Sequence, residues 1–78
     1  MVPVTEANDI EPHERAEIRE ILEEALEDRF PEEPRMFTKS VNGQWVIEVL
    51  PSGRGRGGGG KVVIDQKLMR AVDVLFYQ

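Results

Sequence analysis

The chain has 78 residues, no cysteine and a formal net charge of −5. This length allows one domain with a modest hydrophobic core, and the lack of cysteine excludes both a disulfide framework and a thiolate metal site. No apolar run approaches the about 20 residues of a membrane span, and no basic and then hydrophobic signal opens the chain, so we expect a cytoplasmic protein.

The charges are distributed unequally along the chain. Residues 1–34 contain twelve acidic and three basic residues, whereas residues 35–78 contain three acidic and seven basic residues. The two parts therefore carry charges of −9 and +4. Such a division favours either an acidic helix that lies beside a basic sheet edge or two surfaces that meet different partners.

A long amphipathic helix is expected over about residues 10–30. Residues 1–8 form an N-terminal tail that can add a short edge strand, and residues 9–78 form a single domain. Asp9 is the expected N-cap, and Pro12 fits a first helical turn. Apolar residues recur at helical spacing: Ala16, Ile18, Ile21, Leu22, Ala25, Leu26 and Phe30. The helix must end before Pro31, because proline cannot continue it.

A β-hairpin is expected next. Two β-prone runs, 35–41 and 44–50, are separated by Asn42 and Gly43, which suit the positive φ angles of a type I′ turn. This register places the following side chains on one face: Met36, Thr38, Ser40, Trp45, Ile47 and Val49. The other face receives Phe37, Lys39, Val41, Val46, Glu48 and Leu50. Both faces are partly apolar, so one receives the helices, and the other is covered by the rest of the chain or left for another chain.

A glycine-rich loop at residues 51–60 follows the hairpin, with six glycines and two arginines. It is longer than the roughly two to five residues of an ordinary hairpin loop. Such a segment is either a loop in which disorder is tolerated or a site that contacts a partner through its backbone and guanidinium groups. A third strand is predicted after it, over residues 61–64.

A second helix is predicted over residues 66–77, with Asp65 as its cap. Its apolar residues recur at helical spacing: Leu68, Ala71, Val72, Leu75 and Phe76. Val74, Phe76 and Tyr77 favour a strand instead, so both conformations stay open for this segment. With the helix, the fold class is α+β in the order α-β-β-β-α, with two helices on one face of a three-stranded antiparallel sheet.

This element order is similar to that of the double-stranded-RNA-binding domain. Residues 65–71 also resemble the basic start of the second helix of that family. The cationic pair and the following lysine of the family correspond here to Gln66, Lys67 and Arg70. Because those positions depart from the family pattern, the resemblance implies the topology alone.

The sequence predicts neither an enzyme nor a bound cofactor or metal. The glycines before Lys61 match most of a phosphate-binding loop, but Val62 stands where that loop needs a hydroxyl. His13 is the single histidine and lies in the first turn of the expected helix, where exposure is ordinary. The hydroxyl residues have no evident base and orienting acid beside them.

The leading functional hypothesis is a small non-enzymatic protein-binding module, such as an adaptor, an inhibitor or an assembly subunit. Acidic residues at three- and four-residue spacing form one side of the first helix: Glu17, Glu20, Glu24 and Glu27. Phe37 and Trp45 of the hairpin are the expected apolar contacts. A homodimer is a special case of this hypothesis, and small acidic chains of this kind are also typical of inhibitors encoded by phages or mobile elements.

The alternative hypothesis is a nucleic-acid-binding module. Arg54 and Arg56 of the glycine-rich loop would contact phosphates, because mobile guanidinium groups can follow an irregular backbone. Lys61, Lys67 and Arg70 would extend this basic patch. The acidic helix opposes the approach of any polyanion, and nucleic acid is therefore the second choice of partner.

Overall fold

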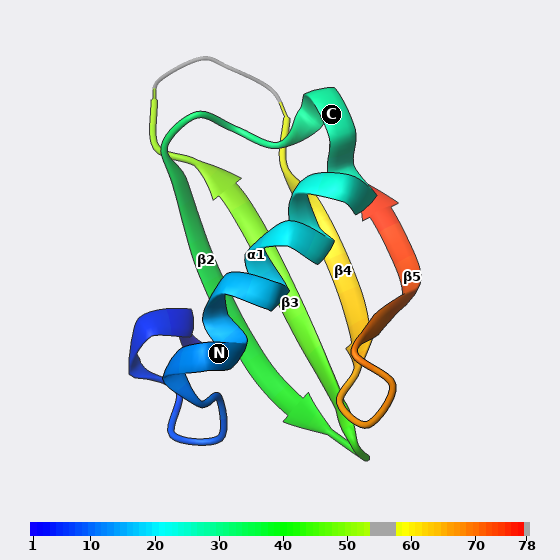
Figure 1. The fold of residues 1–78 in the computed structure, drawn as a ribbon. Helices are drawn as coiled ribbons and strands as arrows, with labels where there is room; N and C mark the ends of the chain where they lie inside the picture. Colours follow the sequence, from blue (N-terminus) through cyan, green and yellow to red (C-terminus); the bar gives the residue numbers. More distant parts are fainter. Residues whose placement is uncertain (54–57, 78) are drawn as a thin grey trace.

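Within residues 1–53 and 58–77, which the computed structural model describes, the chain forms an α+β fold of one α-helix on a five-stranded antiparallel sheet (Figure 1). The strands lie in the sheet in chain order, from β1 to β5. In sequence the elements are β1 Val2–Pro3, η1 Val4–Glu6, α1 Pro12–Leu26, η2 Glu27–Arg29, β2 Pro34–Val41, β3 Gln44–Pro51, β4 Gly60–Asp65 and β5 Arg70–Phe76. The predicted order with two helices and three strands is therefore wrong, although the α+β class is confirmed.

Helix α1 occupies the segment expected from the hydrophobic period. Glu11, and not Asp9, is the N-cap residue, and its backbone N–H donates to Glu14 Oε1 at 2.9 Å. Pro12 opens the helix, where a missing N–H costs nothing. The helix ends where Glu27 adopts a positive φ of 52°, and the short turn η2 leads to Pro31. The helical prediction for this part of the chain is confirmed, and the prediction of Asp9 as its cap is wrong.

The hairpin of β2 and β3 is confirmed with its register. Asn42 and Gly43 adopt φ angles of 50° and 79°, as a type I′ turn requires. Thr38 pairs with Ile47, and Ser40 pairs with Trp45, so the predicted division into two faces is correct.

The segment after β4 is a strand and not a second helix. Asp65 Oδ1 accepts hydrogen bonds from the backbone N–H groups of Lys67 and Leu68, at 2.9 and 2.7 Å, as a helix cap would. The chain completes a single turn, which Met69 ends with a φ of 52°, and β5 then pairs with β4. Pairing satisfies the open edge of β4, and it agrees with the β preference of the valine and aromatic residues in β5. The likeness to the double-stranded-RNA-binding topology ends here, because residues 66–77 do not form its second helix.

The N-terminal residues cover one side of the sheet. Val2 and Pro3 pair with β2, and Val4 and Ala7 are buried against the same side of the sheet as α1. The hydrophobic core lies between these residues, α1 and the inner face of the sheet. Its buried residues are Val4, Ala7, Ile10, Ile18, Leu22, Leu26, Trp45, Ile47, Val49, Val62 and Ile64.

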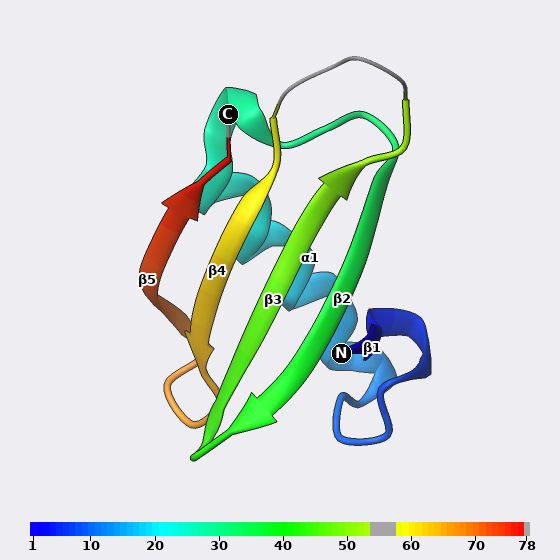
Figure 2. The ribbon, with the colours of Figure 1, turned by 180° about the vertical axis from the view of Figure 1, so that it is seen from behind.

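The face of the sheet opposite to α1 is not covered by another described element. Seen from behind, β2 to β5 stand in front of α1, and no element of the described chain lies over them (Figure 2). No helix among the described residues is long and apolar enough to cross a membrane.

Two glycines of the glycine-rich loop are required by the fold. A Cβ at Gly59 would lie 2.1 Å from the backbone oxygen of Val49, and one at Gly60 would lie 2.5 Å from that of Leu75. Gly59 also holds the ends of three elements together: its N–H donates to Arg29 O at 2.8 Å, and its carbonyl accepts from Tyr77 N at 3.2 Å. Tight backbone contact therefore accounts for the glycines at the end of this loop, without disorder or a partner.

Candidate protein-binding surfaces

The bare side of the sheet is the first candidate surface, and we call it the outer face. Its apolar members come from all four long strands: Phe37, Val46, Leu50, Val63 and Leu75. Leu75 is 54% exposed, and the others are partly buried by their neighbours in the sheet. Val46 lies directly opposite Val63, and Leu75 is a diagonal neighbour of Val63. Phe37 is a diagonal neighbour of Val46 and Leu50. These diagonal contacts join the apolar side chains into one strip across the sheet.

Charged residues alternate with the apolar ones on the outer face. Lys39 on β2 and Asp73 on β5 are both exposed, and they lie on opposite sides of the strip. In the centre, Glu48 on β3 lies directly opposite Lys61 on β4 in the register of the two strands. The two middle rows of the outer face therefore have a cation on β2, an anion on β5 and two opposite charges between them. Further charged residues lie in rows nearer the ends of the sheet: Arg35, Asp65 and Arg70.

Tyr77 lies directly after β5, at one end of the outer face. Its hydroxyl donates a hydrogen bond of 2.6 Å to Glu48 Oε2, across β4. Burial, and then the hydrogen bond and charge of Glu48, raise the pKa of Tyr77 to about 12. The tyrosine is therefore neutral at physiological pH and fixes the position of the Glu48 carboxylate.

The acidic side of α1 is the second candidate surface. Its four predicted members are all exposed: Glu17, Glu20 and Glu24 lie on α1, and Glu27 is the first residue of η2. The core contacts of the helix are made by Ile18, Leu22 and Leu26, so the carboxylates lie away from the sheet. Near them, Arg19 Nε forms an ion pair of 3.2 Å with Glu23 Oε2, one turn along the helix.

Trp45 and Phe37, the two apolar contacts expected from the hairpin, lie on opposite faces of the sheet, as the hairpin register predicts. Trp45 is 2% exposed and packs in the core, whereas Phe37 lies on the outer face. The indole Nε1 of Trp45 donates to Asp9 Oδ2 at 3.0 Å, and Ser40 Oγ donates to the same oxygen. The Ser40 hydrogen bond is the main reason that the pKa of Asp9 is lowered. Trp45 thus holds the chain before α1 in place and offers no exposed surface.

The basic residues of the alternative hypothesis do not form one cluster among the described residues. Lys61 lies at the start of β4, whereas Lys67 and Arg70 lie beyond its other end. Arg54 and Arg56 lie outside the described residues.

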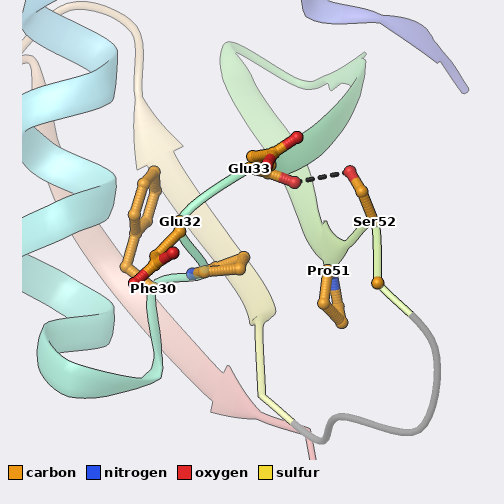
Figure 3. Close-up of a pocket in the computed structure, with 7 residues that line it drawn as sticks. Phe30, Glu32, Glu33, Pro51 and Ser52 are labelled. Atoms are coloured by element: carbon orange, nitrogen blue, oxygen red, sulfur yellow. Dashed lines mark hydrogen bonds between the residues drawn. The ribbon is translucent and has the colours of Figure 1, made fainter.

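A surface depression of about 490 Å³ lies where the chain leaves η2 and where β3 ends (Figure 3). The residues that line it are Phe30, Pro31, Glu32, Glu33, Pro51, Ser52 and Gly53. The Ser52 hydroxyl donates to the Glu33 backbone oxygen at 2.5 Å. The hydroxyl of Ser52 is therefore bound to the backbone that leads into β2.

The sequence reasoning missed half of the outer face. The contribution of β2 and β3 follows from the hairpin register. Val63 was not placed on the outer face because the register of the third strand was not predicted. Asp73 and Leu75 were not placed there because the predicted fold used the helical alternative for residues 66–77. The β preference of Val74, Phe76 and Tyr77 was the signal that could have extended the face to β5.

Comparison with protein-family models, with curated proteins and with solved structures finds no match for this chain. The fold and its surfaces therefore define the class of protein. It is a small two-layer α+β protein with an acidic helix on one side and an uncovered, partly apolar sheet face on the other.

Proposed function

We propose that the chain is a small non-enzymatic protein-binding module that acts as an adaptor, an inhibitor or a subunit of an assembly. The outer face is the observation that carries this proposal. Apolar side chains of neighbouring strands lie there in a continuous strip, and no described element covers them. A contiguous apolar patch on a small protein is typical of an interaction site, because leaving it in water forgoes hydrophobic stabilisation.

The acidic side of α1 is proposed as a second, electrostatic surface. Its exposed carboxylates would accelerate the approach of a basic protein surface, since charge complementarity acts mainly on the rate of association. The apolar strip lies on the other side of the molecule, so the two surfaces can act at the same time.

Site-specific photo-crosslinking tests the proposal. A photoreactive residue is placed at Phe37 on the outer face or at Glu24 on α1, in cells of the organism that carries the gene. We expect a covalent product with a second polypeptide at one or both positions. The control position is Leu68, which is 62% exposed in the turn between β4 and β5. If neither surface yields a product above that control, the proposal fails.

Charge reversal separates the acidic surface from the outer face. Replacing Glu20, Glu24 and Glu27 with lysine should slow the association with a basic partner, while circular dichroism stays unchanged. An unaltered association rate would exclude α1 as a docking surface. Electrophoretic titration with nucleic acids at two salt concentrations, with Arg54→Ala and Arg56→Ala as variants, tests the alternative hypothesis.

A further inference from the structure

The outer face has an order of charges and apolar groups that complements itself. We propose that it binds the outer face of a second copy of this chain. The two sheets pack face to face about a two-fold axis that runs parallel to the strands, between β3 and β4. This inference rests on the proposed function, because it names the partner of the same surface.

The first argument is the row of residues through the middle of the sheet. Lys39, Val46, Val63 and Asp73 lie opposite one another on β2, β3, β4 and β5. The proposed axis places β2 of one copy over β5 of the other, and β3 over β4. Lys39 then faces Asp73 of the other copy, and Val46 faces Val63. The row therefore forms two ion pairs around an apolar centre.

The next row along the strands fits in the same way. Phe37, Glu48, Lys61 and Leu75 lie opposite one another on the same four strands. The axis brings Phe37 onto Leu75 of the other copy and Glu48 onto Lys61. Each charge meets an opposite charge, and each apolar residue meets an apolar residue, so one operation satisfies both rows.

Sheet geometry allows these contacts. Stacked sheets lie about 10 Å apart, and their strands cross at about 30° because each sheet is twisted. Because of this angle, β2 of one copy is shifted relative to β5 of the other by roughly the length of one residue. The long side chain of Lys39 can span this shift and still reach Asp73. Within one copy, Lys39 and Asp73 are three strand spacings or about 14 Å apart, so they do not pair with each other.

Other two-fold arrangements fit less well. An axis across the strands would place β2 over β2 and bring the cations Arg35 and Lys39 of one copy against those of the other. Pairing through the open edge of β5 would leave Lys39 and the whole apolar strip in water. The axis parallel to the strands is the arrangement in which opposite charges meet and the strip is covered.

The size of the face sets the strength of the contact. Four strands of six to eight residues give each copy a face of roughly 15 by 25 Å. Counted over both copies, this area is below the about 1,200 Å² of a standard specific interface, so the dimer should be weak, reversible and dependent on concentration. Both acidic helices would remain on the outside.

Charge exchange between two variants tests the pairing of Lys39 with Asp73. With Lys39→Asp alone, an aspartate at position 39 of each copy faces Asp73 of the other copy. With Asp73→Lys alone, a lysine at position 73 of each copy faces Lys39 of the other copy. Each variant should weaken dimerisation by at least about tenfold, because like charges oppose association. An equimolar mixture of the two variants should recover the dimer, because every pair in the mixed dimer has opposite charges. The molar mass is measured by light scattering and sedimentation over a concentration series, against 8.9 kDa for one chain.

Matched controls separate this geometry from net charge. Lys67→Asp and Glu32→Lys make the same changes of charge at exposed positions away from the outer face. Both should dimerise like the original chain, alone and mixed. Circular dichroism of every variant shows whether it is folded.

Three results would overturn the inference: a monomer up to about millimolar concentration, a dimer that Lys39→Asp does not weaken, or folded variants that do not recover the dimer on mixing. A dimer insensitive to Lys39→Asp would point to pairing through the β5 edge. A monomer that still crosslinks to another protein through position 37 would overturn the inference and leave the proposed function intact. A monomer without any crosslink would overturn both.

Discussion

Trp45 and Asp9, 36 positions apart in sequence, are joined by a hydrogen bond of 3.0 Å from the indole Nε1 to the carboxylate. Trp45 lies on the central strand β3, near its hairpin end, and is buried, whereas Asp9 lies in the segment that leads into α1. Ser40 donates to the same carboxylate, and Gln66 Nε2 donates to Ser40 Oγ at 3.1 Å. This small polar network fixes the N-terminal segment over one end of the sheet.

Asp9→Ala should lower the free energy of unfolding by about 1–3 kcal/mol, because the buried indole N–H of Trp45 loses its acceptor. Urea denaturation at neutral pH measures this change. Glu6→Ala, at an exposed position of the same segment, is the control and should stay within about 0.5 kcal/mol of the original chain. An Asp9→Ala variant as stable as this control would show that the network contributes nothing.

Asp9 should also make the stability depend on pH in acid. Its pKa is lowered in the folded state, first by the Ser40 hydrogen bond, so the stabilisation is complete above the ordinary value of 3.8. It is lost as the pH falls through the folded-state pKa, because the protonated group no longer accepts both bonds. Asp9→Asn should show a smaller loss of stability between neutral and acidic pH than the original chain. Equal acid sensitivity of the two proteins would contradict this prediction.

Tyr77 should titrate at an unusually high pH and destabilise the fold when it does. Its pKa is raised to about 12 from 10.0, so the stabilisation is complete below pH 10.0 and is lost as the pH rises toward 12. The chain has one tyrosine, and the ultraviolet absorbance of tyrosinate therefore reports this group alone. Tyr77→Phe should remove the tyrosinate signal and reduce the loss of stability in alkali. Titration at the ordinary value would exclude the bond to Glu48.

Thr38 is the one buried polar residue among the described part of the core, and it is 2% exposed. Its hydroxyl has no hydrogen-bond partner among the described residues. Thr38→Val should therefore stabilise the protein by up to about 1 kcal/mol, because valine has a similar shape and no polar group to desolvate. Thermal denaturation compares it with Thr5→Val, an exposed control that should be neutral. A marked loss of stability in Thr38→Val alone would reveal a partner for the hydroxyl.

Gly59→Ala should be among the most damaging small substitutions. The added Cβ would overlap the backbone oxygen of Val49, and Gly59 has a φ of 77°, which costs a residue with a side chain of order 1–3 kcal/mol by itself. We expect a loss of more than about 2 kcal/mol in denaturant unfolding. Gly53→Ala is the matched control, because its Cβ would meet no atom of the described residues within 4 Å. Similar stability of the two variants would refute the tight approach at Gly59.

Local signals in the sequence are sufficient to predict α1 and the hairpin of β2 and β3. Helical spacing of apolar residues up to Pro31 is a local signal, and Asn42 with Gly43 selects a turn whose geometry sets the register of both strands. The division of the hairpin residues into two faces follows directly from that register. The exposure of the glutamates on α1 follows from the same helical period.

Contacts between segments that are distant in sequence set the conformation of residues 66–77 and the position of Trp45. Locally, Leu68, Val72 and Leu75 fit a helix, but the open edge of β4 supplies hydrogen-bond partners that favour a strand. Trp45 alternates along β3 as expected, and the N-terminal residues that bury it are distant in sequence. The outer face exists because β5 joins the sheet. Its charge order depends on the register of four strands, and long-range pairing sets that register beyond the hairpin.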